Sequence, residues 1–142
     1  MKYYILEPEV AGGLGQNADL DRSVHPPRVT RFHYQFDGWL GDPLLETVAC
    51  FIVTDGLKEK IKTMQASGAK FADVEISKSG EFEDFFPNRG LPQFAWLQVN
   101  GNAGRDDFGL SRTHRLVVSE RILDLLRTEG MSHCDISEFN ND

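Results

Sequence analysis

Two similar stretches of sequence decide the predicted fold, "FIVTDGLKEKIKTMQASG" at residues 51–68 and "LVVSERILDLLRTEG" at residues 116–130. Each begins with a short apolar strand pattern, continues with a residue suited to cap a helix, Thr54 or Ser119, and then has an acid that favours a helix N-terminus. Apolar residues follow at helical spacing, and a glycine stands where the helix should end. Both stretches therefore predict a strand followed by a capped helix, and we expect Leu57, Ile61, Ile122 and Leu126 to be buried.

The similarity extends past the two helices. With Phe51 aligned on Leu116 and a gap of three residues, Gly68 falls on Gly130. Strand-like patterns follow both glycines, and the alignment places Ala72, Asp73 and Val74 on Cys134, Asp135 and Ile136. We predict a repeated strand–helix–strand unit over 51–76 and 116–139. The alternative is that any two such units would look this similar.

The rest of the chain reads as further strands, one short helix and loops. Strands are expected at 2–10, 29–36 and 94–99, a loop at 11–28 and a turn at 37–43, and Ser79 would cap a short helix that presents Phe82, Phe85 and Phe86 on one face. In the strand 29–36, Phe32, Tyr34 and Phe36 should point inward, and Arg31, His33 and Gln35 should point to solvent. We predict an α+β fold in a single domain, 1–142, with two main helices on one mixed, largely antiparallel sheet.

The glycines in "AGGLGQN", residues 11–17, raise the question of a phosphate-binding loop. Such a loop needs a following helix and, in the P-loop, a lysine. The residues after Gly15 have no helical repeat and no lysine, and Pro26 and Pro27 would block a helix. We expect these glycines to turn the chain sharply after its first strand.

Composition limits the function classes. The chain has 142 residues and a net charge of −7, and its basic residues do not form a cluster that would neutralise phosphates, which argues against nucleic-acid binding. No apolar run is long enough for a membrane span, and the N-terminus does not resemble a signal peptide. We therefore expect a cytoplasmic protein in which Cys50 and Cys134 are reduced core residues. An acidic surface serves solubility or a basic partner.

No set of nucleophile, base and acid is evident along the chain. His133 and Asp135 flank Cys134 but should point to the opposite face of a strand. The four histidines lie far apart, so we expect no metal or other cofactor. Asp106 and Asp107 in "GRDDFGL" would be either turn residues or a paired acid site.

Trp39 in "DGWLGD" is the strongest candidate for a binding residue. A tryptophan between glycines either closes the core or forms an exposed anchor, and here Asp37 and Asp42 flank it. An aromatic anchor among acids would suit a basic partner. We predict an acidic binding face formed by Asp37, Trp39 and Asp42 together with Asp106 and Asp107.

Several segments together resemble a family of bacterial immunity proteins that are encoded near polymorphic toxins. The resemblance rests on "YYILEPE" at the start, "GRDDFGL" at 104–110 and "LVVSERILDLL" at 116–126, and is strongest over 94–139. It implies a small cytoplasmic α+β protein that binds and neutralises a cognate toxin by direct contact, and it supplies no catalytic residues. We expect the toxin to be basic around its active site. The alternative is a small enzyme that uses Asp106 and Asp107, with Arg112 or His114.

Overall fold

The computed structural model describes residues 2–25 and 27–140, and its three helices and many short strands form an α+β fold. The helices are α1 (Asp55–Thr63), α2 (Gly80–Phe85) and α3 (Glu120–Glu129). The strands of the first half are β1 (Tyr3–Glu7), β2 (Gly12–Leu14), β3 (Asp19–Asp21), β4 (Arg28–Arg31), β5 (His33–Phe36), β6 (Leu44–Thr47) and β7 (Cys50–Thr54). Those of the second half are β8 (Ala69–Ala72), β9 (Glu75–Lys78), β10 (Phe94–Val99), β11 (Phe108–Leu110), β12 (Leu116–Ser119) and β13 (Asp135–Glu138).

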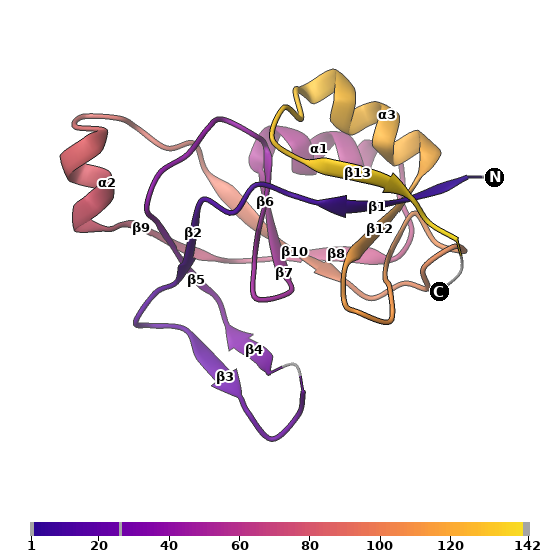
Figure 1. Cartoon of the computed structure of the whole chain (residues 1–142), viewed down its shortest axis with the longest axis horizontal. Coiled ribbons are helices and arrows are strands. Elements are labelled where there is room, and N and C mark those ends of the chain that lie inside the picture. The colour runs from indigo at the N-terminus through magenta and orange to yellow at the C-terminus, as the bar shows by residue number, and fades with distance from the viewer. Residues whose placement is uncertain (1, 26, 141–142) are drawn as a thin grey trace.

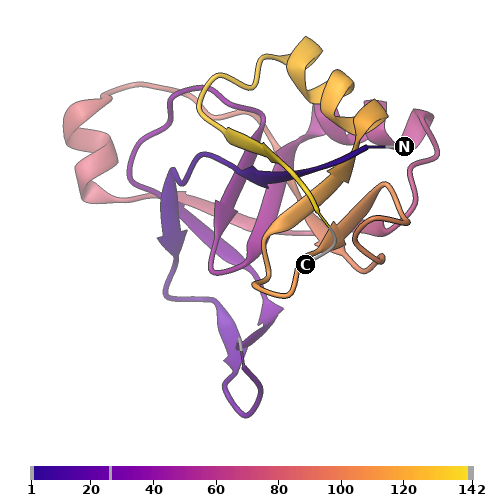
Figure 2. The same cartoon turned by 45° about the vertical axis from the view of Figure 1, so that its right-hand side comes forward.

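These strands form several sheets, so the prediction of one sheet is wrong although the α+β class is confirmed. Two four-stranded sheets have the orders β6-β7-β10-β8 and β11-β12-β1-β13, and every neighbouring pair in them is antiparallel. A third sheet, β2-β5-β9, is mixed because β5 and β9 are parallel. β3 and β4 form a separate hairpin, which extends away from the rest of the molecule (Figures 1 and 2). The periodicity of a strand does not indicate which strand it will pair with. The sequence pattern therefore could not distinguish one sheet from several.

The two four-stranded sheets are built in the same way. In each, a hairpin leads into a helix and then a parallel strand, and an antiparallel strand from elsewhere in the chain fills the gap: β10 in the first sheet and β1 in the second. The registers also agree, because Phe51 pairs with Leu97 where Leu116 pairs with Leu6. The predicted repeat is therefore present in the sheet pairing. Its first unit ends at Ala72 rather than at residue 76, and Phe71, not Val74, corresponds to Ile136.

The helix ends follow the expected signals with two exceptions. Helix α1 ends at Thr63 with Met64 as its C-terminal cap, so the prediction that Gly68 ends this helix is wrong. Thr54 caps α1 by accepting a hydrogen bond from the amide of Leu57, and Ser79 caps α2 by accepting one from the amide of Phe82. Gly130 ends α3 with a φ of 97°, in the left-handed region that glycine adopts most easily. Ser119 stands at the N-cap of α3, but its hydroxyl donates to Asp107 and makes no capping bond.

Helices α1 and α3 lie beside each other and cover the same side of the two four-stranded sheets (Figure 1). The prediction that Leu57, Ile61, Ile122 and Leu126 are buried is confirmed, and all four belong to one shared core. Lys60 of α1 also forms an ion pair with Glu129 of α3 at 2.7 Å. Burial of each such aliphatic side chain stabilises the fold by about 1.5–3 kcal/mol, so this core is what joins the two units.

A second core lies on the other face of the β6-β7-β10-β8 sheet. Alternation along β7 sends Phe51 and Val53 to the shared core and Ile52 to this second one. The residues that pack against this face come from outside the two repeated units. They include Tyr34 and Phe36 from β5 and Phe82 from α2. The first sheet is thus packed on both faces.

Several local predictions fail in the segments around this second core. Residues 11–28 are not all loop, since β2 and β3 lie within them. The strand expected between Gly68 and residue 76 is split into β8 and β9. Gly12 does not make a turn: a Cβ there would lie 1.9 Å from the carbonyl oxygen of Gln35 on the paired strand. Phe85 is 73% exposed rather than inward-facing. His33 is buried and does not point to solvent as predicted. Its Nδ1 accepts a hydrogen bond from the amide of Asn17, and its Nε2 is hydrogen-bonded to Ser77.

Candidate functional site

Trp39 lies half-buried in the loop between β5 and β6. Its indole nitrogen donates to the carbonyl oxygen of Asp42 at 2.9 Å, and its ring meets Phe94 edge-on with 5.9 Å between centroids. The guanidinium of Arg89 lies 5.3 Å from the centre of the indole. Trp39 therefore closes the second core and still presents part of its ring to solvent.

Large apolar side chains are exposed next to this tryptophan. Val10 and Leu40 are each 63% exposed, and with Trp39 and Phe86 they line a shallow groove of about 360 Å³. Asp37, which is exposed, also lines this groove. We call these five residues, Val10, Asp37, Trp39, Leu40 and Phe86, the Trp39 patch.

Acidic residues extend the Trp39 patch along α2. Phe86 is the C-terminal cap of this helix, and the preceding turn exposes Glu83, Asp84 and the ring of Phe85. Figure 1 shows α2 at the end of the molecule away from both chain termini. The result is a surface that combines apolar side chains with carboxylates, with Arg89 as a basic group within it.

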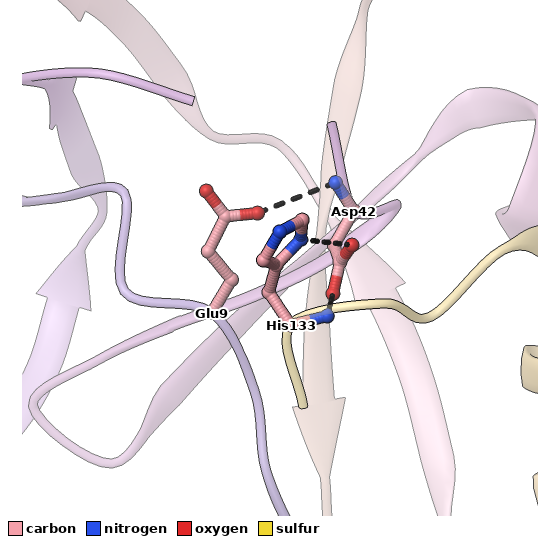
Figure 3. Close-up of side chains that lie close together, drawn as sticks. All are labelled: Glu9, Asp42 and His133. Atoms are coloured by element: carbon pink, nitrogen blue, oxygen red, sulfur yellow. Dashed lines mark hydrogen bonds and ion pairs between the residues drawn. The ribbon is translucent and has the colours of Figure 1, made fainter. Parts of the chain in front are cut away.

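Asp42 lies beneath the patch and not on it. Its side chain is 1% exposed, and its carboxylate accepts hydrogen bonds from the backbone amides of Ser132 and His133 at 3.1 and 2.8 Å. The His133 ring lies 3.1 Å away through Nδ1 (Figure 3). Asp42 therefore fastens the loop that follows α3, and the prediction that it belongs to an exposed acidic face is wrong.

Glu9 is a second buried carboxylate at the same place, and sequence reasoning missed it. It is 7% exposed, and it accepts from the backbone amides of Leu40 at 2.7 Å and Asp42 at 3.3 Å. The glutamate thus holds the turn that carries Leu40 on the surface. No local spacing could have indicated this contact, because residues 9, 42 and 133 lie on three separate segments.

Asp107 is also held inside the fold. Arg121 Nε and Nη2 donate to its two carboxylate oxygens at 2.9 and 2.6 Å, and Ser119 Oγ donates at 2.7 Å. The amide of Ser67 donates to it as well. The hydrogen bonds from Arg121, with those from Ser119 and Ser67, hold the pKa of Asp107 well below its usual range. Asp107 stays ionised and bonded, so the prediction that it is exposed for binding is wrong.

Asp106 makes a local turn. Its carboxylate accepts from the amide of Asn102 at 2.7 Å, and its side chain is half-buried. The loop that carries it, between β10 and β11, lies on the right of Figure 1, whereas the β5–β6 loop lies left of centre. The prediction that the two loops form one continuous acidic face is therefore wrong.

The residues of the predicted enzyme site do not converge. Asp106 and Asp107 precede β11, whereas Arg112 and His114 follow it, at the other end of this three-residue strand. The two thiols are also poorly suited to nucleophilic chemistry. Burial raises the pKa of Cys50 to about 11 and that of Cys134 to about 12, so both thiols stay protonated at neutral pH.

Comparison with known proteins adds no family assignment. No protein-family model matches the chain, and a search of curated proteins found no similar sequence. Within residues 2–25 and 27–140, no helix has the length and apolar character that a membrane crossing requires.

Proposed function

We propose that this protein is an immunity protein of the cytoplasm, which binds a cognate bacterial toxin and neutralises it by direct contact. The observation that carries the proposal is the Trp39 patch, where exposed apolar side chains lie beside carboxylates. Val10 and Leu40 expose most of their side chains next to a groove. Contiguous apolar surface of this kind marks interaction sites on monomeric proteins.

The charge of the surface favours a basic partner. The chain carries a net charge of −7, and Asp37, Glu83 and Asp84 are exposed on or beside the patch. A toxin that acts on nucleic acid needs basic groups to hold phosphate. Carboxylates on the immunity protein would occupy those groups, and Leu40 and Trp39 would exclude water from the centre of the contact.

The alternative of a small enzyme around Asp106 and Asp107 has less support. The carboxylate of Asp107 is occupied by Arg121, Ser119 and Ser67, and that of Asp106 closes a turn. Neither is placed to exchange a proton with a substrate.

The test is to measure the affinity of the purified toxin for wild type and for Leu40→Asp. We expect the substitution to weaken binding tenfold or more, because it puts a charge at the apolar centre of the contact. Leu40 is largely exposed, so the fold should survive, which circular dichroism would check. Higher salt should slow association, since opposite charges steer the encounter.

Asp106→Asn is the matched control in the β10–β11 loop. If it left affinity unchanged while Leu40→Asp reduced it, the Trp39 patch would be supported as the contact surface. If Asp106→Asn weakened binding and Leu40→Asp did not, the interface would lie at the β10–β11 loop. If the wild-type protein bound no cognate toxin, the proposed function itself would be overturned.

A further inference from the structure

Glu9, Asp42 and His133 form a cluster of metal-binding groups from three segments of the chain. One potential ligand atom from each lies within 4.8 Å of the others. Figure 3 shows the three side chains close together. Glu9 comes from the chain after β1, Asp42 from the loop before β6 and His133 from the loop after α3. The two carboxylates are buried, while His133 is 42% exposed, so the cluster is open to solvent on one side.

The second unit of the internal repeat has a buried aspartate in a comparable place, and an arginine pairs with it. In the second unit Asp107 fastens the loop after α1, and Arg121 neutralises it from the first turn of α3. The residue of α1 that corresponds to Arg121 is Gly56, which has no side chain. Asp42 does the same work in the first unit without an arginine, and Glu9 adds a second negative charge.

Backbone amides hold both carboxylates in place but supply no formal charge. Asp42 accepts from two amides and Glu9 from two others. Buried carboxylates are usually paired or coordinate a metal. Here the side chain in contact with Asp42 is that of His133, whose Nδ1 lies 3.1 Å from Oδ1.

We propose that Glu9, Asp42 and His133 bind a divalent transition-metal ion of the zinc class. The distance from His133 Nδ1 to Asp42 Oδ1 is 3.1 Å, close to the roughly 3.3 Å that separates two ligands on a tetrahedral ion with bonds of about 2.0–2.1 Å. The ion replaces the hydrogen bond between these two atoms, and the ring proton moves from Nδ1 to Nε2. Imidazole with carboxylate favours zinc-like ions over calcium or magnesium, which prefer oxygen alone.

The amides that fix the carboxylates would act as outer partners that orient the ligands. Three protein ligands leave a fourth position that faces solvent through the exposed side of His133. The ion would join the chain after β1 to the loops at 40–42 and 132–133. This inference does not depend on the proposed toxin binding, because its test measures the metal directly.

The test is calorimetric titration of the full chain with zinc chloride at neutral pH. We expect one equivalent to bind, and we expect His133→Ala and Glu9→Gln each to weaken binding tenfold or more. Circular dichroism would establish that His133→Ala, whose ring is partly exposed, remains folded.

Two variants serve as controls. His114→Ala removes an exposed histidine outside the cluster, and Cys134→Ser removes the thiol next to His133, which is itself a possible zinc ligand. Both should keep the wild-type affinity. The proposal is overturned if wild type binds no zinc, if folded His133→Ala binds as tightly as wild type, or if Cys134→Ser abolishes binding.

Discussion

The β7–α1–β8 and β12–α3–β13 units share one register, but they surround their buried aspartates with different groups. Asp42 lies before β6, the strand that pairs with β7 of the first unit, and it fastens the loop after α3 of the second unit. Asp107 lies before β11, the strand that pairs with β12 of the second unit, and it fastens the loop after α1 of the first unit. The two positions differ by one residue relative to their strands. Each unit therefore holds the other's loop.

The difference lies in how each carboxylate is neutralised. Asp107 has Arg121, which is charged at every physiological pH, whereas Asp42 has His133 and the nearby Glu9. The second site is complete within the chain, and the first is not. The same frame can thus serve purely as a structural clasp in one unit and offer a ligand site in the other.

The units also differ in how they use the chain. The first sheet takes all its strands from residues 44–99, but the second needs β1 from the N-terminal end beside β13 from the C-terminal end. Its central pairing therefore joins residues more than 100 positions apart. Closing such a long loop costs entropy before the contacts form, so the second sheet should form late in folding.

Matched core truncations would be the most severe test of the equivalence. Leu57→Ala in α1 and Ile122→Ala in α3 remove aligned, fully buried side chains from the shared core. Each should lower the free energy of unfolding by about 2–5 kcal/mol, through lost burial and the cavity left behind. Urea denaturation followed by circular dichroism would measure both.

Lys62→Ala, on the exposed side of α1, is the control and should change stability by less than about 0.5 kcal/mol. A loss that small for Ile122→Ala would contradict the shared core. A large loss for one truncation and not the other would show that the two helices are not equivalent in packing.

Asp107→Asn would test the clasp that is complete within the chain. The variant loses the ion pair with Arg121 and should cost about 1–3 kcal/mol at pH 7. Because the ionised form is favoured in the native state, its contribution is full above about pH 4, the ordinary value for an unfolded aspartate. It is lost as the pH falls from there toward the lowered pKa of the folded protein.

Denaturation midpoints measured from pH 2.5 to 7 would check this. The gap between wild type and Asp107→Asn should be constant from pH 7 to about 5 and should narrow below about pH 4. A gap that stayed the same at low pH would mean that the charge of Asp107 does not stabilise the fold.

The repeated units were the most predictable part of the molecule. Caps at Thr54 and the glycine at 130, with apolar residues at helical spacing, are local signals, and burial of Ile61 and Leu126 follows from them. The strand predicted at 29–36 is present as β4 and β5, but β2 and β3 were harder to predict, because each is three residues long and has a weak pattern. His33 reads as solvent-facing by alternation, but Gly15 leaves room for its ring to be buried.

The candidate sites were predicted only in part. Leu40 and Val10 gave no signal as binding residues, because single apolar residues in loops are common in any sequence. Asp42 and Asp107 resemble surface acids in composition, and their burial depends on amides and an arginine that are distant in the chain. Local sequence cannot encode such long-range hydrogen bonds in a readable way.

The smallest effect should come from a circular permutant that exchanges the roles of the two units. Its chain would open between Gly90 and Leu91, before β10, and a short glycine–serine linker would join Asn140 to Lys2. These ends are close, since the amide of Phe139 donates to the carbonyl oxygen of Tyr3 at 2.9 Å. β10 would then enter the first sheet as an N-terminal strand, as β1 now enters the second.

Because Gly90 is exposed and the linker closes a short gap, the free energy of unfolding of this permutant should change by less than about 1 kcal/mol. Urea denaturation would measure this, with a permutant opened inside α3 as a control that should not fold. If the Gly90 permutant also failed to fold, continuity through residues 73–93 would be essential, and the two sheets would resemble each other in pairing without being interchangeable.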